Sequence, residues 1–574
     1  AGVTSRVDLL LTIDNSRSMA DKQAILGSAV PALIGSLTNP PCVDEEGMPA
    51  QDQPTGPSSA CPSDTTRIFP PVTDLHLGVI STSIGDHGGD VCPTLPPPSA
   101  NDDQARLIAR SPGGGSVATY DDLGFLAWDP DGELTPPGET SAQALTDDLR
   151  TMVLGAGQQG CGYEAPLESW YRFLIDPDPY LTIEEDAGRA VMSGTDSTIL
   201  QQRRDFLRPD SLVIIMMLSD ENDCSIRDGS QYFYAAKSQT SAGQYHLPRA
   251  QITCESDPND PCCRSCGQTD DGCPPKGAEC DGSHDVLSDS FNLRCYDQKR
   301  RFGIDFLQPI DRYVDGLTSH TVADREGNVV GNPLFSDLDP NDDISSVRSP
   351  QFVILASIQG VPWQDIARRT SEGEPDLRQG RDAQGRRVGG FQSAAELSAN
   401  DTWDLILGDP TYYHTQSSAR PQDPLMRESV DPRSGTNPIT GDSLAPPGAA
   451  TMANPINGHE YTIDQRNDLQ YACIFELPQP RDCTAPGVVA CDCPDAVNDN
   501  PLCQNDQNQF GTTQYRAKAY PGIRQLELLK QLGARAALGS ICPAQLDDAS
   551  RPDFGYVPSI RALVEAIRPR LATE

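Results

Sequence analysis

The sequence lacks several features that would assign it to a common class of protein. No run of about 18 or more apolar residues is present, which is the length that a membrane-spanning helix needs. It also contains no H-E-x-x-H helix of a metalloprotease, no G-x-S-x-G nucleophile elbow and no P-loop. We therefore expect neither a membrane span nor an enzyme.

Basic residues are scarce relative to acidic ones. The 574 residues include 44 Lys and Arg against 82 Asp and Glu, which gives a formal net charge of −38 at pH 7. Phosphates would be repelled by such a surface, so nucleic acids and anionic membranes are not expected as partners. The charge is compatible with cation binding, although solubility alone also explains it.

Cysteine, in contrast, is frequent. The 18 cysteines form an even count and lie among Pro, Gly and Asn in loops, which favours up to nine disulfides and an oxidising compartment. We therefore expect a secreted or cell-surface protein. Because Ala1 lies close to the first apolar run, we also expect a processed or trimmed N-terminus that once carried a secretion signal or lipid anchor.

Two details of the cysteine pattern leave alternatives. Cys263-x-x-Cys266 has the spacing of half a zinc ribbon, but no second C-x-x-C pair accompanies it in the same stretch, so disulfides are favoured. Cys161 and Cys224 follow two loops that should be neighbours in space. These two cysteines could pair and brace the metal site, but the sequence leaves the disulfide connectivity open.

The first twenty residues combine an apolar strand with a polar turn. The run Val7–Ile13 is nearly continuous in apolar residues, as in a strand buried on both faces of a parallel sheet. Asp14, Ser16 and Ser18 follow it directly. A helix is then expected, because four apolar residues share one of its faces: Leu26, Val30, Leu33 and Leu37.

This turn has the ligand types that a hard divalent cation prefers. Mg²⁺ takes octahedral oxygen coordination, keeps several waters and is usually held by one or two carboxylates. Asp14, Ser16 and Ser18 would supply half of such a site at the carboxyl end of a strand. Taken alone, the pattern favours the alternative interpretation, in which Asp14 or Ser16 is a helix N-cap.

A second apolar strand ends in the same way. Leu212–Leu218 is an unbroken apolar run, and Asp220 follows just past its end. With these residues the sequence resembles a von Willebrand factor type A domain that carries a metal-ion-dependent adhesion site. That resemblance implies a doubly wound sheet whose first strand ends in D-x-S-x-S, matched by Asp14, Ser16 and Ser18. It also implies a fourth strand ending in an Asp that faces the same ion, matched by Asp220. The chain is similar to cysteine-rich, secreted or lipid-anchored type A proteins of myxobacteria.

The sequence departs from this family in the loop that should supply a third ligand. The family places a Thr there, whereas the loop 155–164 contains none. Glu164 could substitute with a carboxylate, as in integrin β subunits, or a water could fill the position. Asp21 lies where those subunits carry part of an adjacent cation site, but Lys22 interrupts the acidic pair. We therefore expect Asp21 to be a surface residue.

The chain is longer than the usual domain of about 50 to 250 residues, and long polar stretches separate its strand-like segments. We predict one α/β fold, a doubly wound and mostly parallel sheet flanked by helices, with large disulfide-rich insertions. Its predicted parts are 1–220, the first part of the type A domain; 221–300, a Cys-rich insertion; 301–372, the domain continued; 373–520, an insertion rich in Pro, Asp and Asn with a Cys cluster; and 521–574, the last strand and closing helix.

Hydrophobic periodicity places the remaining elements. Strands are expected at 75–83, 125–128, 352–360, 469–475 and 535–542, and helices at 141–154, 162–175, 302–317 and from Trp363 onward. The closing helix is expected from one apolar face formed by Ile560, Leu563, Val564, Ile567 and Leu571.

Two other clusters of polar side chains are candidates for additional cation sites. Clustered oxygens that could bind Ca²⁺ occur at Asp337, Asp339, Asn341 and Asp343 and at Asp129 with Asp131, although acidic turns without an ion are the favoured interpretation. His87 and His459 lie in polar loops and are expected at the surface.

The sequence therefore predicts an extracellular, metal-dependent adhesion or ligand-binding protein. Mg²⁺, Ca²⁺ or Mn²⁺ would be held by Asp14, Ser16, Ser18, Asp220 and Glu164, and the carboxylate of a protein or surface partner would complete its shell. The alternative is a structural surface or filament subunit stapled by disulfides, in which the metal site is vestigial or serves self-assembly.

Overall fold

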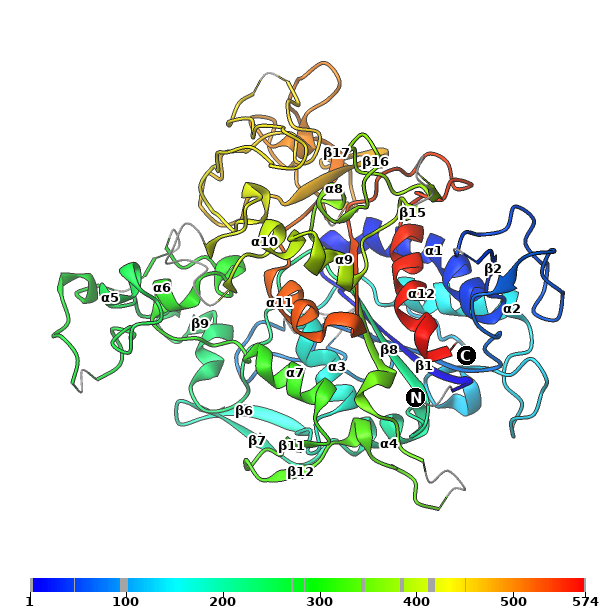
Figure 1. Cartoon of the computed structure of the whole chain (residues 1–574). Helices are drawn as coiled ribbons and strands as arrows, with labels where there is room; N and C mark the ends of the chain where they lie inside the picture. The colour runs from blue at the N-terminus through cyan, green and yellow to red at the C-terminus, as the bar shows by residue number, and fades with distance from the viewer. Residues whose placement is uncertain are drawn as a thin grey trace.

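The fold is known from a computed structural model. It describes residues 4–45, 47–92, 102–269, 272–282, 284–285, 288–341, 346–381, 387–410, 419–449, 451–488 and 490–571. A six-stranded sheet lies at its centre (Figure 1). In order across the sheet, the strands are β18 (Ala536–Ser540), β13 (Val353–Gln359), β8 (Leu212–Leu218), β1 (Arg6–Ile13), β4 (Asp74–Ser81) and β5 (Leu126–Trp128). Neighbouring strands are parallel except β4 and β5, which are antiparallel.

The central strands are apolar along their whole length because both faces of the sheet are covered. Every residue of β8 and β13 is buried, as is every residue of β1 after Arg6. Leu9 and Leu11 belong to one hydrophobic core and Leu10 to a second one on the opposite face. The apolar runs at these three strands are thus confirmed as strands of a parallel sheet.

Helices cover both faces of the sheet. One core includes residues of α1 (Ala20–Thr38), α2 (Ala142–Gly155) and α12 (Val557–Leu571). The other includes residues of α3 (Pro166–Leu174), α4 (Ser197–Phe206), α7 (Ile310–Thr318) and α11 (Ile523–Leu532). Shorter helices are α5 (Thr253–Ser256), α6 (Gln298–Phe302), α8 (Trp363–Ile366), α9 (Ala394–Ala399) and α10 (Thr402–Ile406). No helix in the described ranges combines the length and apolar character required to cross a bilayer.

The order of the strands reverses beside β1. The chain passes from β1 outward to β4 and β5, and then returns to the other side of β1 to build β8, β13 and β18. In open α/β sheets, ligands bind in the crevice outside the carboxyl ends of the strands at such a reversal. The turns that follow β1 and β8 therefore lie at the position where this architecture places a binding site.

The first predicted insertion extends away from the sheet, whereas residues of the second pack into both hydrophobic cores (Figure 1). The first contains the hairpin β9 (Gln239–Thr240) and β10 (Gly243–Gln244) with α5 and α6. Four disulfides join its segments: Cys224–Cys295, Cys254–Cys263, Cys262–Cys273 and Cys266–Cys280. The preference for disulfides over zinc at Cys263 and Cys266 is therefore confirmed.

The second insertion carries two hairpins. They are β14 (Gly380–Arg381) with β15 (Arg387–Val388), and β16 (Cys473–Asp482) with β17 (Thr513–Ala519). Cys473–Cys542 ties β16 to the segment after β18, while Cys483–Cys491 and Cys493–Cys503 close local loops. The remaining disulfides are Cys42–Cys61 and Cys92–Cys161, and no cysteine is free.

Three further antiparallel strand pairs lie outside the central sheet. They are β2 (Cys42–Val43) with β3 (Thr66–Arg67), β6 (Thr182–Asp186) with β7 (Arg189–Ser193), and β11 (Thr321–Ala323) with β12 (Val329–Gly331).

Cys161 and Cys224, whose pairing the sequence left open, do not bond to each other. Their loops are indeed neighbours, since the amide of Cys224 donates to the carbonyl of Glu164 at 3.0 Å. Cys161, however, bonds to Cys92 from the loop after β4, and Cys224 bonds to Cys295 at the end of the first insertion. Although the two loops are close together, each cysteine forms its disulfide with a third segment of the chain.

Several predicted element boundaries are also corrected. The helix expected at 162–175 begins only at Pro166, which suits the first helical position because proline has no N–H to donate. The helix expected at 302–317 is split, because α6 ends before the left-handed Gly303 and α7 begins after Pro309. The strand expected at 469–475 begins at Cys473, and the helix from Trp363 ends after one turn.

Candidate metal-binding site

Asp14 and Asp220 lie at the same edge of the sheet because β1 and β8 are parallel neighbours whose last residues, Ile13 and Leu218, are paired. Asp14 is completely buried, and its amide donates to the carbonyl of Leu218 at 2.9 Å. Its Oδ1 accepts from the amide of Ser16 at 2.8 Å, and its Oδ2 accepts from the hydroxyl of Ser219 at 2.7 Å. The register of two strands thus brings together two carboxylates that are far apart in sequence.

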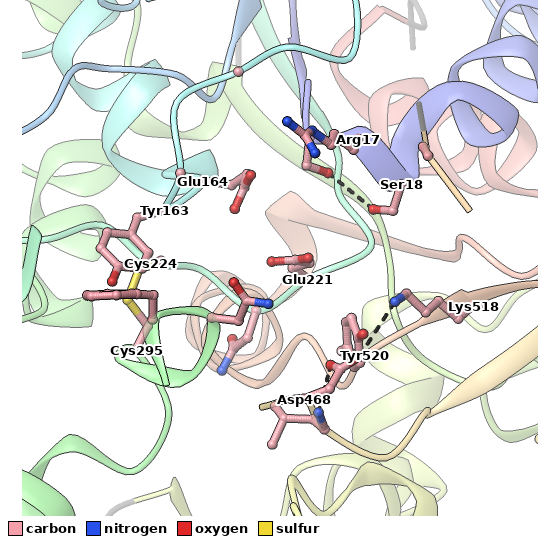
Figure 2. Close-up of a pocket in the computed structure, with 18 of the residues that line it drawn as sticks. Arg17, Ser18, Tyr163, Glu164, Glu221, Cys224, Cys295, Asp468, Lys518 and Tyr520 are labelled. Carbon is pink, nitrogen blue, oxygen red and sulfur yellow. Dashed lines mark hydrogen bonds and ion pairs between the residues drawn. A yellow bond between two sulfur atoms is a disulfide. The ribbon is translucent and has the colours of Figure 1, made fainter. Parts of the chain in front are cut away.

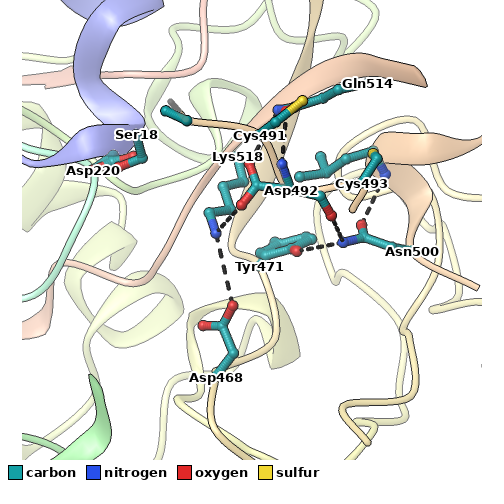
Figure 3. Close-up of polar contacts among 12 residues, drawn as sticks. Ser18, Asp220, Asp468, Tyr471, Cys491, Asp492, Cys493, Asn500, Gln514 and Lys518 are labelled. Atoms are coloured by element: carbon teal, nitrogen blue, oxygen red, sulfur yellow. Dashed lines mark hydrogen bonds and ion pairs between the residues drawn. The ribbon is translucent and has the colours of Figure 1, made fainter. Parts of the chain in front are cut away.

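The two predicted serine ligands lie beside these carboxylates. Ser16 and Ser18 are half-buried, and their hydroxyl oxygens are 3.2 Å apart. Figure 3 shows Ser18 next to Asp220. Gln23 links the turn after β1 to the loop after α2, since its Nε2 donates to the carbonyls of both Asp14 and Gly157 at 2.8 Å.

The loop between α2 and α3 brings Glu164 to the same place. The amide of Gly160 donates to the carbonyl of Asn15 at 2.9 Å, and the amide of Cys161 donates to Ser83 Oγ at 2.8 Å. A Cβ at Gly160 would lie 2.4 Å from Asn15 Oδ1, so a larger residue would require the Asn15 side chain to shift. Figure 2 shows the Glu164 carboxylate pointing into the cavity next to that of Glu221.

The carboxyls of this cluster influence each other strongly. Burial, followed by the charge of Asp220, raises the pKa of Asp14 to about 6. Burial, followed by Asp220 and Asp14, raises the pKa of Glu221 to about 8. Burial together with Glu221 and Asp14 holds the pKa of Glu164 well above its usual range. These carboxyls therefore lack sufficient compensating positive charge, which a cation would supply.

Glu221 was not predicted as a site residue. It follows Asp220 directly, but sequence reasoning assigned it to the start of the first insertion. The clustering of Ser219, Asp220 and Glu221 after a buried strand was the available signal.

Lys22 and Asp21 lie beside the cluster, in the first turn of α1. Lys22 is buried, and its Nζ lies 2.8 Å from Asp220 Oδ2 and 2.9 Å from the carbonyl of Ser18. Asp220 Oδ1 is buried and accepts no hydrogen bond within the described structure. Asp21, expected at the surface, is only partly exposed and pairs with Arg481 of the second insertion at 2.7 Å.

The cluster lies in a cavity of about 910 Å³ whose walls come from both insertions (Figure 2). The first insertion contributes Phe291 and Tyr296, and the second contributes Asp468 and Lys518. Lys518 is held against Asp492 at 2.7 Å, as Figure 3 shows, between the rings of aromatic neighbours. Loops of the central fold, among them Asp90 and Gln159, complete the walls of the cavity.

The alternative cation sites are less well formed. The carboxylate of Asp129 accepts three backbone amides, from Glu133, Leu134 and Gly138, so it organises its own turn. Asp337 and Asp339 likewise accept the amides of Asp339 and Asn341. Asp131 is exposed, and Asp343 lies outside the described residues. Cys92, Asp102 and Cys161 also cluster, but the two sulfurs are bonded at 1.98 Å and offer no thiolate.

The expectation that His87 and His459 lie at the surface is wrong, because both are buried. His87 Nδ1 lies 3.0 Å from the carboxylate of Asp228, and His459 Nδ1 lies 2.7 Å from the carbonyl of Glu460. His87 is buried against a residue of the first insertion and His459 is buried within the second, so the polar sequence around each histidine does not indicate its burial.

Comparisons with known proteins leave the family of this chain open. No model of a protein family matches the sequence, and no curated protein is similar to it. Among solved structures, a pilus adhesin from Streptococcus pneumoniae gives a TM-score of 0.16 at 9% identity, covering 62% of this chain. The chain spans 39% of that adhesin, and at this TM-score the likeness carries no argument.

Proposed function

We propose that this protein is an extracellular metal-dependent adhesion or ligand-binding protein of the von Willebrand factor A type. Its divalent cation, Mg²⁺ or a similar ion, would be held by Asp14, Asp220, Ser16 and Ser18, with Glu164 or Glu221 nearby. The observation that carries this proposal is the convergence of these carboxyls at the carboxyl ends of β1 and β8, where the strand order reverses.

The donor set suits a hard cation. Carboxylates and hydroxyls are the oxygen ligands that Mg²⁺ and Ca²⁺ take. The buried Asp220 Oδ1 without a hydrogen-bond partner is the kind of acceptor that a cation would satisfy, since buried polar atoms are nearly always paired. Asp14, in turn, is oriented through both of its oxygens by Ser16 and Ser219.

A partner would complete the site with an acidic group. A bound cation supplies positive charge and an open coordination position, to which a carboxylate can bind with charge-assisted strength. Because the cluster lies within a cavity between the two insertions, the partner's carboxylate would project from a protruding segment. The nine disulfides support an oxidising location such as the cell surface or the surroundings of the cell.

The proposal is tested by titrating the full chain with Mn²⁺ and Mg²⁺ by calorimetry. The wild type is expected to bind one ion at this site, and Asp14→Ala is expected to lose that ion while its circular dichroism stays unchanged. Asp131→Asn, which alters an exposed acid outside the cluster, is the matched control. Equal binding by wild type and Asp14→Ala would contradict the proposed site.

Adhesion is tested separately with immobilised acidic and neutral peptides. Binding to the acidic peptides is expected in Mg²⁺, and it should disappear in EDTA and in Asp14→Ala. Undiminished binding in EDTA would contradict the adhesion role. Metal-dependent self-association in sedimentation, without peptide binding, would instead favour the structural alternative, in which the site serves assembly.

A further inference from the structure

A lysine ammonium is built into the candidate cation site. Lys22 lies in the first turn of α1, and its side chain is only 2% exposed. Its Nζ is 2.8 Å from Asp220 Oδ2, a carboxylate with no exposure at all. Its Nζ also donates to the carbonyl of Ser18 at 2.9 Å, in the turn that carries the predicted ligands.

The two oxygens of Asp220 are in different situations. Oδ2 is paired with the ammonium, whereas Oδ1 is buried and has no partner among the described residues. An ionised carboxylate without water is costly unless a positive charge or hydrogen bonds compensate it. Lys22 provides that compensation through one oxygen and leaves the other available.

The ammonium also has a consequence for any second cation. A divalent ion at Oδ1 of Asp220 would share one carboxylate with a positive charge and be repelled by it at short range. Lys22 thereby offsets one unit of the negative charge at the site. With Asp14 and Asp220 as its two anions, a divalent ion and the Lys22 ammonium leave one net positive charge, which favours an anionic ligand at the open position of the cation.

We propose that Lys22 is an internal counter-cation that holds Asp220 in place before metal arrives, keeps the affinity for the divalent ion low, and so makes occupancy depend on the partner's carboxylate. The inference rests on the proposed function, because it concerns the same site. It assigns Lys22 a positioning role toward Asp220 and a tuning role toward the metal. No contact with the partner is required of it.

The test compares Mn²⁺ affinity and thermal stability in wild type, Lys22→Gln and Lys22→Arg, with Lys530→Gln as a control at an exposed lysine of α11. Lys22→Gln is expected to bind Mn²⁺ at least about tenfold more tightly, since a repelling charge is removed. In EDTA it should melt at a lower temperature than wild type, and saturating Mn²⁺ should close that gap. Lys530→Gln should match wild type in both measurements.

Lys22→Arg keeps the test decisive if Lys22→Gln does not fold. A guanidinium has five donors and can engage both oxygens of Asp220, so Mn²⁺ affinity should fall at least about tenfold while stability in EDTA is kept. Mn²⁺ binding that is unchanged in both Lys22 variants would overturn the role of Lys22 and leave the proposed function standing. Absence of Mn²⁺ binding in wild type and in every variant would instead overturn the proposed function, and with it this inference.

Discussion

The guanidinium of Arg481 lies 2.7 Å from the carboxylate of Asp21, which joins the second insertion to the first turn of α1, next to the candidate metal turn. Both side chains are partly exposed, so the pair contributes no more than about 1 kcal/mol to the free energy of unfolding. We predict that Arg481→Gln changes global stability by less than this amount. In the variant, amide exchange in β16 and β17 should nevertheless be faster than in the wild type, by a larger factor than in β1. Hydrogen-exchange mass spectrometry measures this difference. Unchanged exchange in the hairpin would show that this contact does not hold it.

Asp365 and Asp423 form a buried carboxyl pair that links α8 to the second insertion. Burial, followed by the charge of Asp423, raises the pKa of Asp365 well above its usual range, while Asn437 donates to Asp365 Oδ1 at 2.9 Å. A carboxyl whose pKa is raised on folding contributes stability that is fully present below its unfolded pKa, about 4, and lost as pH rises through the folded value. The pair should therefore weaken the fold as the pH increases.

This pH dependence is measured by urea unfolding between about pH 5 and pH 8. Asp423→Asn supplies an amide that can donate to an ionised Asp365, so the fall in unfolding free energy with pH should be less steep than in wild type. The comparison is made as a difference, because other carboxyls such as Glu428, whose pKa burial raises to about 7, titrate in the same range. Parallel pH profiles for the two proteins would contradict the prediction.

The disulfides should differ in their contributions to stability according to the loops that they close. Cys473–Cys542 spans 69 residues and Cys483–Cys491 spans 8. In the chain-entropy account, the longer loop restricts the unfolded chain more, by about 2 kcal/mol for this ratio of lengths. Replacing both cysteines of the long loop by alanine should therefore lower the unfolding free energy by about that much more than the same change in the short loop. Equal losses in urea titrations would argue against this account.

Gly360, at the end of β13, is required by the chain that returns from the second insertion. A Cβ there would lie 1.6 Å from the carbonyl oxygen of Tyr520, whose amide donates to the carbonyl of Asp220. Gly360→Ala should destabilise the protein by about 2 kcal/mol or more, because backbone must move. Gly35→Ala, at a helical position with no atom within 4 Å of the new Cβ, should be neutral or stabilising by up to about 1 kcal/mol. Similar thermal shifts for the two variants would contradict the assignment.

The central sheet was predictable because its signal is local. The apolar runs at Val7–Ile13 and Leu212–Leu218, and the apolar face of the closing helix, each report burial directly. β17 was missed, since its sequence TQYRAKA contains no run of apolar residues, although most of its residues are buried. Disulfide partners such as Cys92 for Cys161 depend on side-chain direction, which spacing does not encode.

The candidate site was predictable only where its residues directly follow the ends of apolar strands. Asp14, Ser16, Ser18 and Asp220 follow strand ends, and the register of β1 and β8 brings them to one edge. The significance of Lys22 and Glu221 depends on burial by segments far away in the sequence, so the local pattern indicated only an interrupted acidic pair and the start of an insertion.

The most direct test of the account is anomalous diffraction from crystals of the full chain grown with Mn²⁺. We expect one anomalous peak with carboxylate oxygens of both Asp14 and Asp220 at about 2.0 to 2.2 Å, close to the distance for Mg²⁺. Crystals of Asp14→Ala should lack that peak. Ordered Asp14 and Asp220 side chains with no anomalous density between them at saturating Mn²⁺ would contradict the account.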